Sequence, residues 1–309
     1  MEHNNGKKFQ QPYQALFESG ELQKRIDSAL AMLHKCRVCP WNCGINRFKN
    51  EKKVCQSGRM ARVASYNAHF GEENCLRGYR GSGTIFLSGC NLNCVFCQNY
   101  DISQMGVGRD VSPQELAEIM LEIQNNGCHN INLVTPSHFI PQILEALPHA
   151  IESGLKLPIV YNSGGYDAIE SLKLLDEVVS IYMPDFKVYN PVHAKRYFNT
   201  NKYPEVARQA IREMHRQVGD LITDEEGIAT KGLLIRHLVM PEGLSDTAQI
   251  MKFLADEISK NTFINIMAQY RPAAMVTPGK FPEIYRSIHH EEFTEAKNLA
   301  RKAGLSRFD

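Results

Sequence analysis

Three cysteines, Cys90, Cys94 and Cys97, lie within one short stretch of the chain, Ser-Gly-Cys-Asn-Leu-Asn-Cys-Val-Phe-Cys. Three thiolates at this spacing can bind three irons of a [4Fe–4S] cluster, which normally has four protein ligands. One iron then keeps an open position, where a small molecule can bind and be activated. A structural zinc site usually needs four ligands in two separated pairs, and disulfides are not expected without a secretory signal. The stretch therefore predicts a cluster with one open iron.

The Cys-x3-Cys-x2-Cys spacing resembles the signature of the radical S-adenosylmethionine (SAM) enzymes. The resemblance implies that the open iron is chelated by the amino and carboxylate groups of SAM. It also implies that one electron from the cluster cleaves SAM to methionine and a 5′-deoxyadenosyl radical, which abstracts a hydrogen atom. Cys90, Cys94 and Cys97 would then be the catalytic cluster ligands. Phe96, just before the third cysteine, matches an aromatic position that this family places near the adenine.

Composition narrows the class of protein. The chain has 309 residues, with 35 Lys and Arg against 34 Asp and Glu, so no global field favours nucleic acid or an anionic membrane. No apolar run approaches the roughly 18 residues of a membrane span. The polar segment Met1–Gln11 lacks the apolar core of a signal peptide, and the nine cysteines are an odd number. We therefore expect a cytoplasmic protein whose cysteines bind metal.

Hydrophobic periodicity predicts six strands that alternate with helices. The expected strands are Thr84–Ser88, Ile131–Thr135, Pro158–Tyr161, Val178–Met183, Leu233–Val239 and Phe263–Met267. The expected helices are Ser19–Lys35, Pro113–Gln124, Pro141–Ile151, Ile169–Leu175, Pro204–Val218, Asp246–Ile258 and Glu291–Lys302, with Ser19 and Ser112 as caps of the first two.

This alternation predicts an α/β fold with a parallel sheet and helices on its outer face. The pattern alone does not separate an open doubly wound sheet from a barrel. The radical SAM resemblance implies a partial (β/α)6 barrel with the cluster loop after the first strand, and the cysteine triplet follows Thr84–Ser88. We expect residues 1–78 to form an amino-terminal helix and an irregular cysteine-rich, metal-binding segment, and residues 79–309 to form the barrel and a final helix.

Ligands of parallel β/α folds bind at the carboxyl ends of the strands. The fourth strand is followed by Asp185-Phe-Lys187, which resembles an Asp-x-Lys motif that contacts SAM in the activases of glycyl-radical enzymes. Arg236, inside the fifth strand, has a planar fork suited to a carboxylate. Local ion pairs are the competing interpretation for all three residues.

Two further strand ends carry weaker signals. Asn162 precedes a Gly-Gly pair after the third strand and could hydrogen-bond a ribose or a carboxylate, although a plain turn explains the glycines equally well. After the second strand, many radical SAM enzymes have Gly-Gly-Glu, which binds the SAM amino group. This chain has Thr-Pro-Ser-His instead, so Ser137 or His138 would have to substitute.

A second set of four cysteines precedes the barrel. Cys36, Cys39 and Cys43 lie in the stretch Cys-Arg-Val-Cys-Pro-Trp-Asn-Cys-Gly, and Cys55 follows Cys43 by twelve residues. Its spacing suits either a second [4Fe–4S] cluster or a structural zinc ion. Of the two isolated cysteines, Cys75 is an alternative ligand and Cys128 a small core or surface residue.

From about Cys36 to Pro272 the chain resembles proteins related to pyruvate formate-lyase activating enzyme. Shared features include His69-Phe-Gly-Glu-Glu, the amino-terminal cysteine motif and Ile-Arg-His-Leu-Val-Met-Pro around Arg236. The resemblance implies a radical SAM oxidoreductase supplied by an electron donor such as flavodoxin or ferredoxin. It leaves the substrate open.

Three functions are compatible with these residues. The enzyme could generate a glycyl radical in a partner protein, or modify a small molecule or peptide. The chain could instead be an iron–sulfur electron carrier or binding module without catalysis. SAM consumption separates the last from the first two.

Overall fold

The sheet forms the centre of the protein, whose computed structural model describes residues 10–309. Six parallel strands carry the alternation: β2 (Ser82–Leu87), β4 (Ile131–Val134), β5 (Ile159–Ser163), β6 (Ile181–Pro184), β8 (Ala229–Leu238) and β9 (Phe263–Met267). Each of them overlaps an expected strand. The complete order is β10-β9-β8-β6-β5-β4-β2-β1-β3, with β7 paired to β8, so the sheet is open. The α/β partial-barrel fold is confirmed.

The remaining strands extend this sheet. β1 (Ala61–His69) pairs antiparallel with β2, and β3 (Arg109–Val111) pairs antiparallel with β1. β7 (Ile222–Thr223) pairs antiparallel with β8, and β10 (Arg307–Phe308) lies parallel to β9. The expectation that the cysteine-rich part of residues 1–78 is irregular was wrong at β1, which is a regular strand. Its small and polar residues, with alternate positions partly exposed, gave no apolar run by which to recognise a strand.

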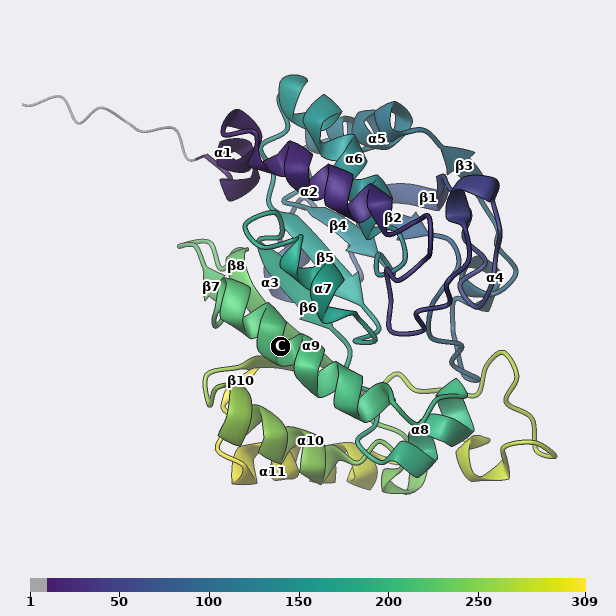
Figure 1. Cartoon of the computed structure of the whole chain (residues 1–309). Coiled ribbons are helices and arrows are strands. Elements are labelled where there is room, and N and C mark those ends of the chain that lie inside the picture. The colour runs from purple at the N-terminus through teal and green to yellow at the C-terminus, as the bar shows by residue number, and fades with distance from the viewer. Residues whose placement is uncertain (1–9) are drawn as a thin grey trace, which may run out of the picture.

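Most of the helices cover the outer side of the sheet (Figure 1), whereas the short helix Asn74–Arg77 packs against the inner face. The helices are α1 (Pro12–Glu18), α2 (Glu21–Ala31), α3 (Asn74–Arg77), α4 (Tyr100–Ser103), α5 (Pro113–Asn125), α6 (Ile140–Glu152), α7 (Ile169–Lys173), α8 (Pro191–Phe198), α9 (Tyr203–Val218), α10 (Thr247–Phe253) and α11 (His290–Lys302). A π-helical turn, Leu254–Ile258, follows α10. No helix in the described part of the chain is long and apolar enough to cross a membrane.

Helix ends show where local sequence decided the structure. At α5, the Ser112 hydroxyl accepts from the Glu115 backbone N–H at 3.1 Å, and the Glu115 carboxylate accepts from the Ser112 N–H at 2.7 Å. This reciprocal capping confirms the expected start. The expected helix Ser19–Lys35 was wrong at its start. Gly20 is the residue before α2 and has a φ of 74°, which breaks the helical path between α1 and α2.

The two faces of the sheet have different partners because successive side chains of a strand point in opposite directions. Ile131, Leu133 and Ile159 belong to the large core shared with the helices. On the other face, Val160 and Ile181 form a small apolar cluster with Leu76 from α3. Polar side chains lie above that cluster, toward the carboxyl ends of the strands.

The boundary expected between residues 78 and 79 stays a prediction. α2 packs against α6, and β1 belongs to the main sheet, so the amino-terminal part is extensively joined to the rest. Of the segment Met1–Gln11, residues 1–9 lie outside the described residues.

We expect Ser112→Ala to lower the free energy of unfolding by about 1 kcal/mol, because the first turn of α5 loses its side-chain cap. Urea unfolding of the wild type and variant measures the difference. Ser112→Thr is the matched control and should keep most of the stability. Equal stability of all three proteins would show that this cap contributes nothing.

Candidate active site

A cavity of about 270 Å³ opens where the parallel strands end. Its walls come from the cysteine loop after β2 and from the carboxyl ends of β4, β5, β6, β8 and β9. The lining residues are Cys90, Leu92, Cys94, Phe96, Cys97, Gln98, Asn99, Ser103, Val134, Thr135, Asn162, Ser163, Gly164, Asp185, Lys187, Arg236, Leu238, Met267 and Gln269. The cavity thus combines three thiols with a cluster of charged and amide side chains.

Neighbouring segments hold the cysteine loop through its backbone. The Val95 N–H donates to the Tyr197 carbonyl at 3.0 Å, and the Val95 carbonyl accepts from the Met275 N–H at 2.9 Å. Gly89, directly before Cys90, has a φ of 82°, and a Cβ atom there would lie 2.4 Å from the Cys55 carbonyl oxygen. Only glycine fits this approach without a shift of the backbone.

Of the three cysteines, Cys94 is buried, and Cys90 and Cys97 are partly buried. Burial raises the pKa of Cys90 to about 12, although the Leu92 N–H donates to its sulfur at 3.2 Å. Burial also raises the pKa of Cys94. The Cys97 sulfur lies 3.2 Å from the Ser103 hydroxyl. Metal binding would displace the thiol protons, so cluster assembly is coupled to proton release.

The donor set fits a cluster rather than one ion shared by all three sulfurs. Within residues 10–309, no three His, Cys, Asp or Glu side chains converge on a point that could hold a single metal ion. A [4Fe–4S] cluster makes a different demand, because each thiolate binds its own iron.

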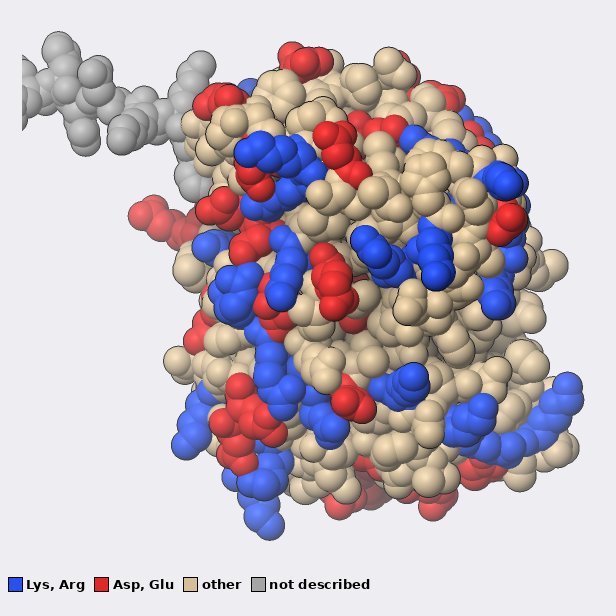
Figure 2. Space-filling view, viewed as in Figure 1, with Lys and Arg blue, Asp and Glu red and all other residues tan. Residues whose placement is uncertain are grey.

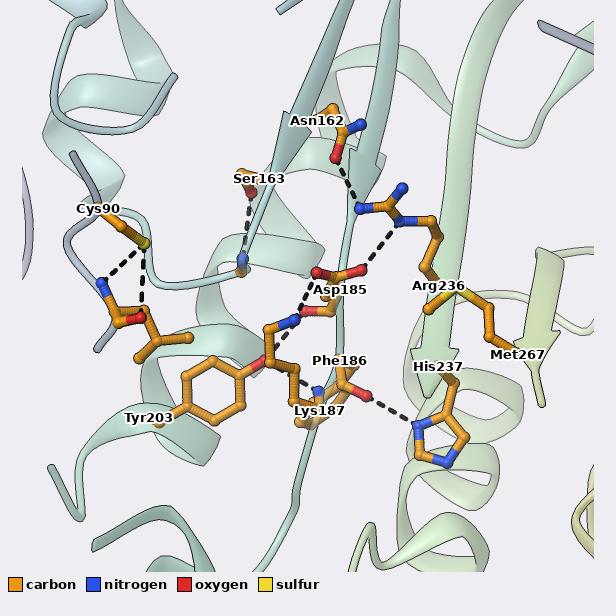
Figure 3. Close-up of polar contacts among 12 residues, drawn as sticks. Cys90, Asn162, Ser163, Asp185, Phe186, Lys187, Tyr203, Arg236, His237 and Met267 are labelled. Carbon is orange, nitrogen blue, oxygen red and sulfur yellow. Dashed lines mark hydrogen bonds and ion pairs between the residues drawn. The ribbon is translucent and has the colours of Figure 1, made fainter. Parts of the chain in front are cut away.

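Opposite the cysteines, Arg236 and Lys187 both bind Asp185 (Figure 3). The Arg236 Nε donates to one carboxylate oxygen at 2.9 Å, and the Lys187 ammonium donates to the other at 2.6 Å. Arg236 also donates to the Asn162 amide oxygen at 2.8 Å. The network therefore joins the ends of β5, β6 and β8. The ion pairs expected as the competing interpretation are present, and they face the cavity.

Charge balance determines the protonation of this network. Burial alone would raise the pKa of Asp185, but Arg236 and Lys187 more than offset it and hold that pKa below its ordinary value. Burial alone would lower the pKa of Lys187, but the charge of Asp185 keeps that pKa above its ordinary value. All three side chains are therefore charged at neutral pH. Several N–H groups of Lys187 and Arg236 remain available to a ligand, because an ammonium has three donors and a guanidinium five.

Backbone contacts fix the turn that carries Asp185 and Lys187. The Tyr203 hydroxyl donates to the Asp185 carbonyl at 3.0 Å and accepts from the Lys187 N–H at 2.9 Å. Gly165 has a φ of 76°, and a Cβ atom there would lie 2.3 Å from the same carbonyl. A side chain at position 165 would therefore collide with the backbone at the end of β6. The neighbouring Gly164 lines the cavity.

Phe96 contributes an aromatic ring to the cavity wall. Its ring is buried. Tyr197, Phe198 and Tyr270 pack edge-on around it, with ring centroids 5.7–6.3 Å away. These contacts fix the orientation of the ring.

Sequence reasoning missed Glu72, which follows β1. It accepts from Asn132 at 2.7 Å and from Arg236 at 3.3 Å. Burial raises the pKa of Glu72 to about 7, and Glu73 adds to the effect, whereas Arg236 opposes it. The motif His69-Phe-Gly-Glu-Glu was noted, but no role could be given to it without knowing that β1 belongs to the sheet.

The structure brings most of the expected residues together. Phe96, Asn162, Asp185, Lys187 and Arg236 line the same cavity as Cys90, Cys94 and Cys97. Ser137 does not line it. The chain turns at Thr135, where φ is 59°, and both Ser137 and His138 are buried beyond the cavity wall. The His138 ring nitrogen Nε2 instead lies 3.0 Å from the Ser88 carbonyl. The second cysteine set, Cys36–Cys55, lies behind the cysteine loop rather than in the cavity.

Comparison with known proteins agrees with this geometry. The model of the family described as the radical SAM superfamily matches residues 84–254, more than half of the chain. The chain belongs to the radical SAM superfamily. It is also 32% identical over 294 residues to the uncharacterized protein MJ0674 of Methanocaldococcus jannaschii, covering 92% of this chain and 79% of that protein. Radical SAM membership implies an enzyme that binds a [4Fe–4S] cluster and SAM.

We expect the Glu72 carboxyl to make stability fall as pH rises from about 4.5 to about 7. In this window the folded protein keeps a proton that the unfolded chain has lost, so raising the pH favours unfolding. Glu72→Gln should remove this contribution to the slope. Urea unfolding at several pH values measures it.

The matched control for this prediction is Glu118→Gln, which changes an exposed carboxylate on α5. The control should keep the wild-type pH dependence. The same slope in Glu72→Gln as in the wild type would contradict the assignment.

Proposed function

We propose that this protein cleaves SAM reductively at a cluster held by Cys90, Cys94 and Cys97, and uses the resulting 5′-deoxyadenosyl radical to abstract hydrogen from a substrate. The observation that carries the proposal is that the three thiols share one cavity with the Arg236–Asp185–Lys187 network. The cluster would supply the electron and the open iron for this chemistry.

The chain's own residues bind and orient SAM in this proposal. The free N–H groups of Lys187 and Arg236 suit the SAM carboxylate, and Asn162 suits the carboxylate or the ribose. Asp185 keeps both cations in place. Phe96 supplies an apolar wall for the adenine. The strand ends and the cysteine loop surround the cavity and so limit the access of water that would quench a radical.

The finer proposal is that the protein is related to pyruvate formate-lyase activating enzyme and generates a glycyl radical in a partner protein. It is supported by Asp185-Phe-Lys187 at the end of β6, where both charged side chains line the cavity. Incubation with a deuterated candidate partner, with deuterium followed into 5′-deoxyadenosine, tests it. Deuterium transfer from a small molecule or peptide would favour modification of that substrate instead. An electron donor such as flavodoxin or ferredoxin is part of the proposal, as is a second metal site at Cys36, Cys39, Cys43 and Cys55.

The central experiment is an assay of 5′-deoxyadenosine from SAM with anaerobically reconstituted, dithionite-reduced protein. We expect Cys97→Ala to lose at least about a hundredfold of the wild-type rate, because the loop loses one of three iron ligands. Cys128→Ala is the matched control. Cys128 is also buried, but it packs beside Gly83 at the opposite end of β2. A cluster that forms and never consumes SAM would favour the electron-carrier function.

We expect Arg236→Lys to weaken SAM binding about tenfold, which corresponds to about 1.4 kcal/mol. Lysine keeps the charge but lacks the fork that joins Asp185, Asn162 and the ligand. Equilibrium binding of SAM to the reconstituted protein measures the change. Arg212→Lys, in an exposed ion pair with Glu257, is the control and should bind SAM as the wild type does. Equal affinity of all three proteins would remove Arg236 from the SAM site.

A further inference from the structure

The four amino-terminal cysteines occupy one neighbourhood. The Cys36 N–H donates to the Ile45 carbonyl at 2.8 Å, and the Gly44 N–H donates to the Cys36 carbonyl at 2.9 Å. These bonds fold the chain back so that Cys43 comes beside Cys36. Burial raises the pKa of Cys39, and the adjacent thiols of Cys55, Cys36 and Cys43 raise it further. Cys55, although distant in sequence, is thus close enough for its thiol to act on Cys36 and Cys39.

Backbone N–H groups also lie beside these sulfurs. The Val38 N–H lies near the Cys36 sulfur, and the Trp41 N–H lies near the Cys39 sulfur. The Leu92 N–H bonds to Cys90 in the same two-residue pattern. Such bonds stabilise thiolates, and in iron–sulfur proteins they tune the cluster potential.

A buried cation also lies beside this set. Arg47 is 1% exposed, and its guanidinium donates to the carbonyls of Gly58 at 2.8 Å and His138 at 2.6 Å. Its Nη2 has no hydrogen-bond partner, and no carboxylate pairs with Arg47 anywhere in residues 10–309. Its charge acts on Cys36. A buried charge needs an opposite one, and metal-bound thiolates would supply it.

The second set touches the loop of the first. The Trp41 indole N–H donates to the Asn91 carbonyl at 2.6 Å. The Cys55 carbonyl packs directly on Gly89, and Cys55 is close enough to contribute to the raised pKa of Cys90. On the outer side, Cys43 is partly exposed and Arg37 is exposed. Figure 2 shows mostly uncharged atoms and several basic side chains between α2 and α8, on the side where this segment lies.

Several contacts join this segment to the rest of the protein. Val38 is buried in the main core, and its carbonyl accepts from the Ser171 hydroxyl at 2.7 Å. Arg47 donates a hydrogen bond from the segment to the His138 carbonyl. The chain then runs from the segment into β1, which pairs with β2 in the sheet. A redox centre in this segment would therefore be held in contact with the first cysteine loop, as an electron relay requires.

We infer that Cys36, Cys39, Cys43 and Cys55 hold a second [4Fe–4S] cluster that relays electrons to the site at Cys90, Cys94 and Cys97, with Arg47 balancing its charge. The inference rests on the proposed function for the identity of the electron acceptor. One electron leaves a low-potential flavin or iron–sulfur protein, which is oxidised, and passes through the second site to the first, which is reduced. No bond or proton changes place in this step.

Metal analysis and electron paramagnetic resonance (EPR) test the site itself. Wild-type protein reconstituted without oxygen should hold about eight irons per chain. Cys39→Ala/Cys43→Ala and Cys90→Ala/Cys94→Ala/Cys97→Ala should each hold about four irons, and dithionite reduction should give a different EPR signal in each. Cys128→Ala, which changes a buried cysteine beside Gly83, is the control and should keep the full iron content. About one zinc with four irons in the wild type would overturn the inference.

Reduction kinetics test the relay. The rate at which reduced flavodoxin reduces the Cys90–Cys97 cluster, followed by EPR on frozen samples, should fall at least about tenfold in Cys39→Ala/Cys43→Ala. Dithionite is small and bypasses the relay, so its reduction rate should change less than about twofold. An unchanged flavodoxin rate would overturn the relay. This readout needs no SAM cleavage, so failure of the inference and failure of the proposed function are distinguishable.

Arg47 provides a variant that leaves all cysteines in place. Arg47→Gln should lower the reduction potential of the second cluster, because a nearby positive charge favours the more negative reduced state. Arg47→Lys should restore most of the potential. Thermal unfolding of both variants identifies any loss of folding. An identical potential in a folded Arg47→Gln variant would exclude the charge-balancing role.

Discussion

The buried ion pair between Arg236 and Asp185 is the interaction on which the site depends. It joins β8 to β6 at the cavity, where the Phe186 N–H also donates to the Arg236 carbonyl at 2.8 Å. Burying two charges costs several kcal/mol per ion, and their attraction repays this cost only with good geometry and further hydrogen bonds. Lys187 and Asn162 supply those bonds. Such a network is a poor way to gain stability and a good way to keep charged groups oriented for a ligand.

Side chains alternate along the strands, so apolar packing on one face of the sheet can offset the free-energy cost of the charged network on the other face. Outward residues such as Leu133 and Ile235 pack in the large apolar core with the helices. Inward residues, including Asn132, Asn162 and Arg236, reach a space that helices do not fill. The outer face thus provides stability, and the inner face is left to bind. The small cluster around Leu76 closes the other end of that space.

Both cysteine sets lie in irregular segments, and each is fixed by the regular structure around it. Tyr197 and the segment at Met275 hold the loop of Cys94 from the barrel side. From the other side, the Cys55 carbonyl presses on Gly89 and Trp41 binds Asn91. The amino-terminal segment therefore forms part of the support of the radical SAM loop. The two cysteine sets are therefore in direct contact through their backbones and Trp41.

The sequence by itself determined what depends on short spacing. Cys90, Cys94 and Cys97 lie in one loop at the spacing of the radical SAM signature, and each strand or helix of the barrel has its own local periodicity, so the family and these elements could be predicted from neighbouring residues. Asp185 and Lys187 were found because both follow a strand end. Only the tertiary structure decided what depends on distant partners. Glu72 reaches Arg236 across 164 positions because β1 joins the sheet edge, and Ser137 misses the cavity because of the turn at Thr135. The spacing of neighbouring residues encodes the cysteine motif and the secondary structure. Burial, ion pairing and the identity of the residues that line the cavity are decided only when segments distant in sequence pack together.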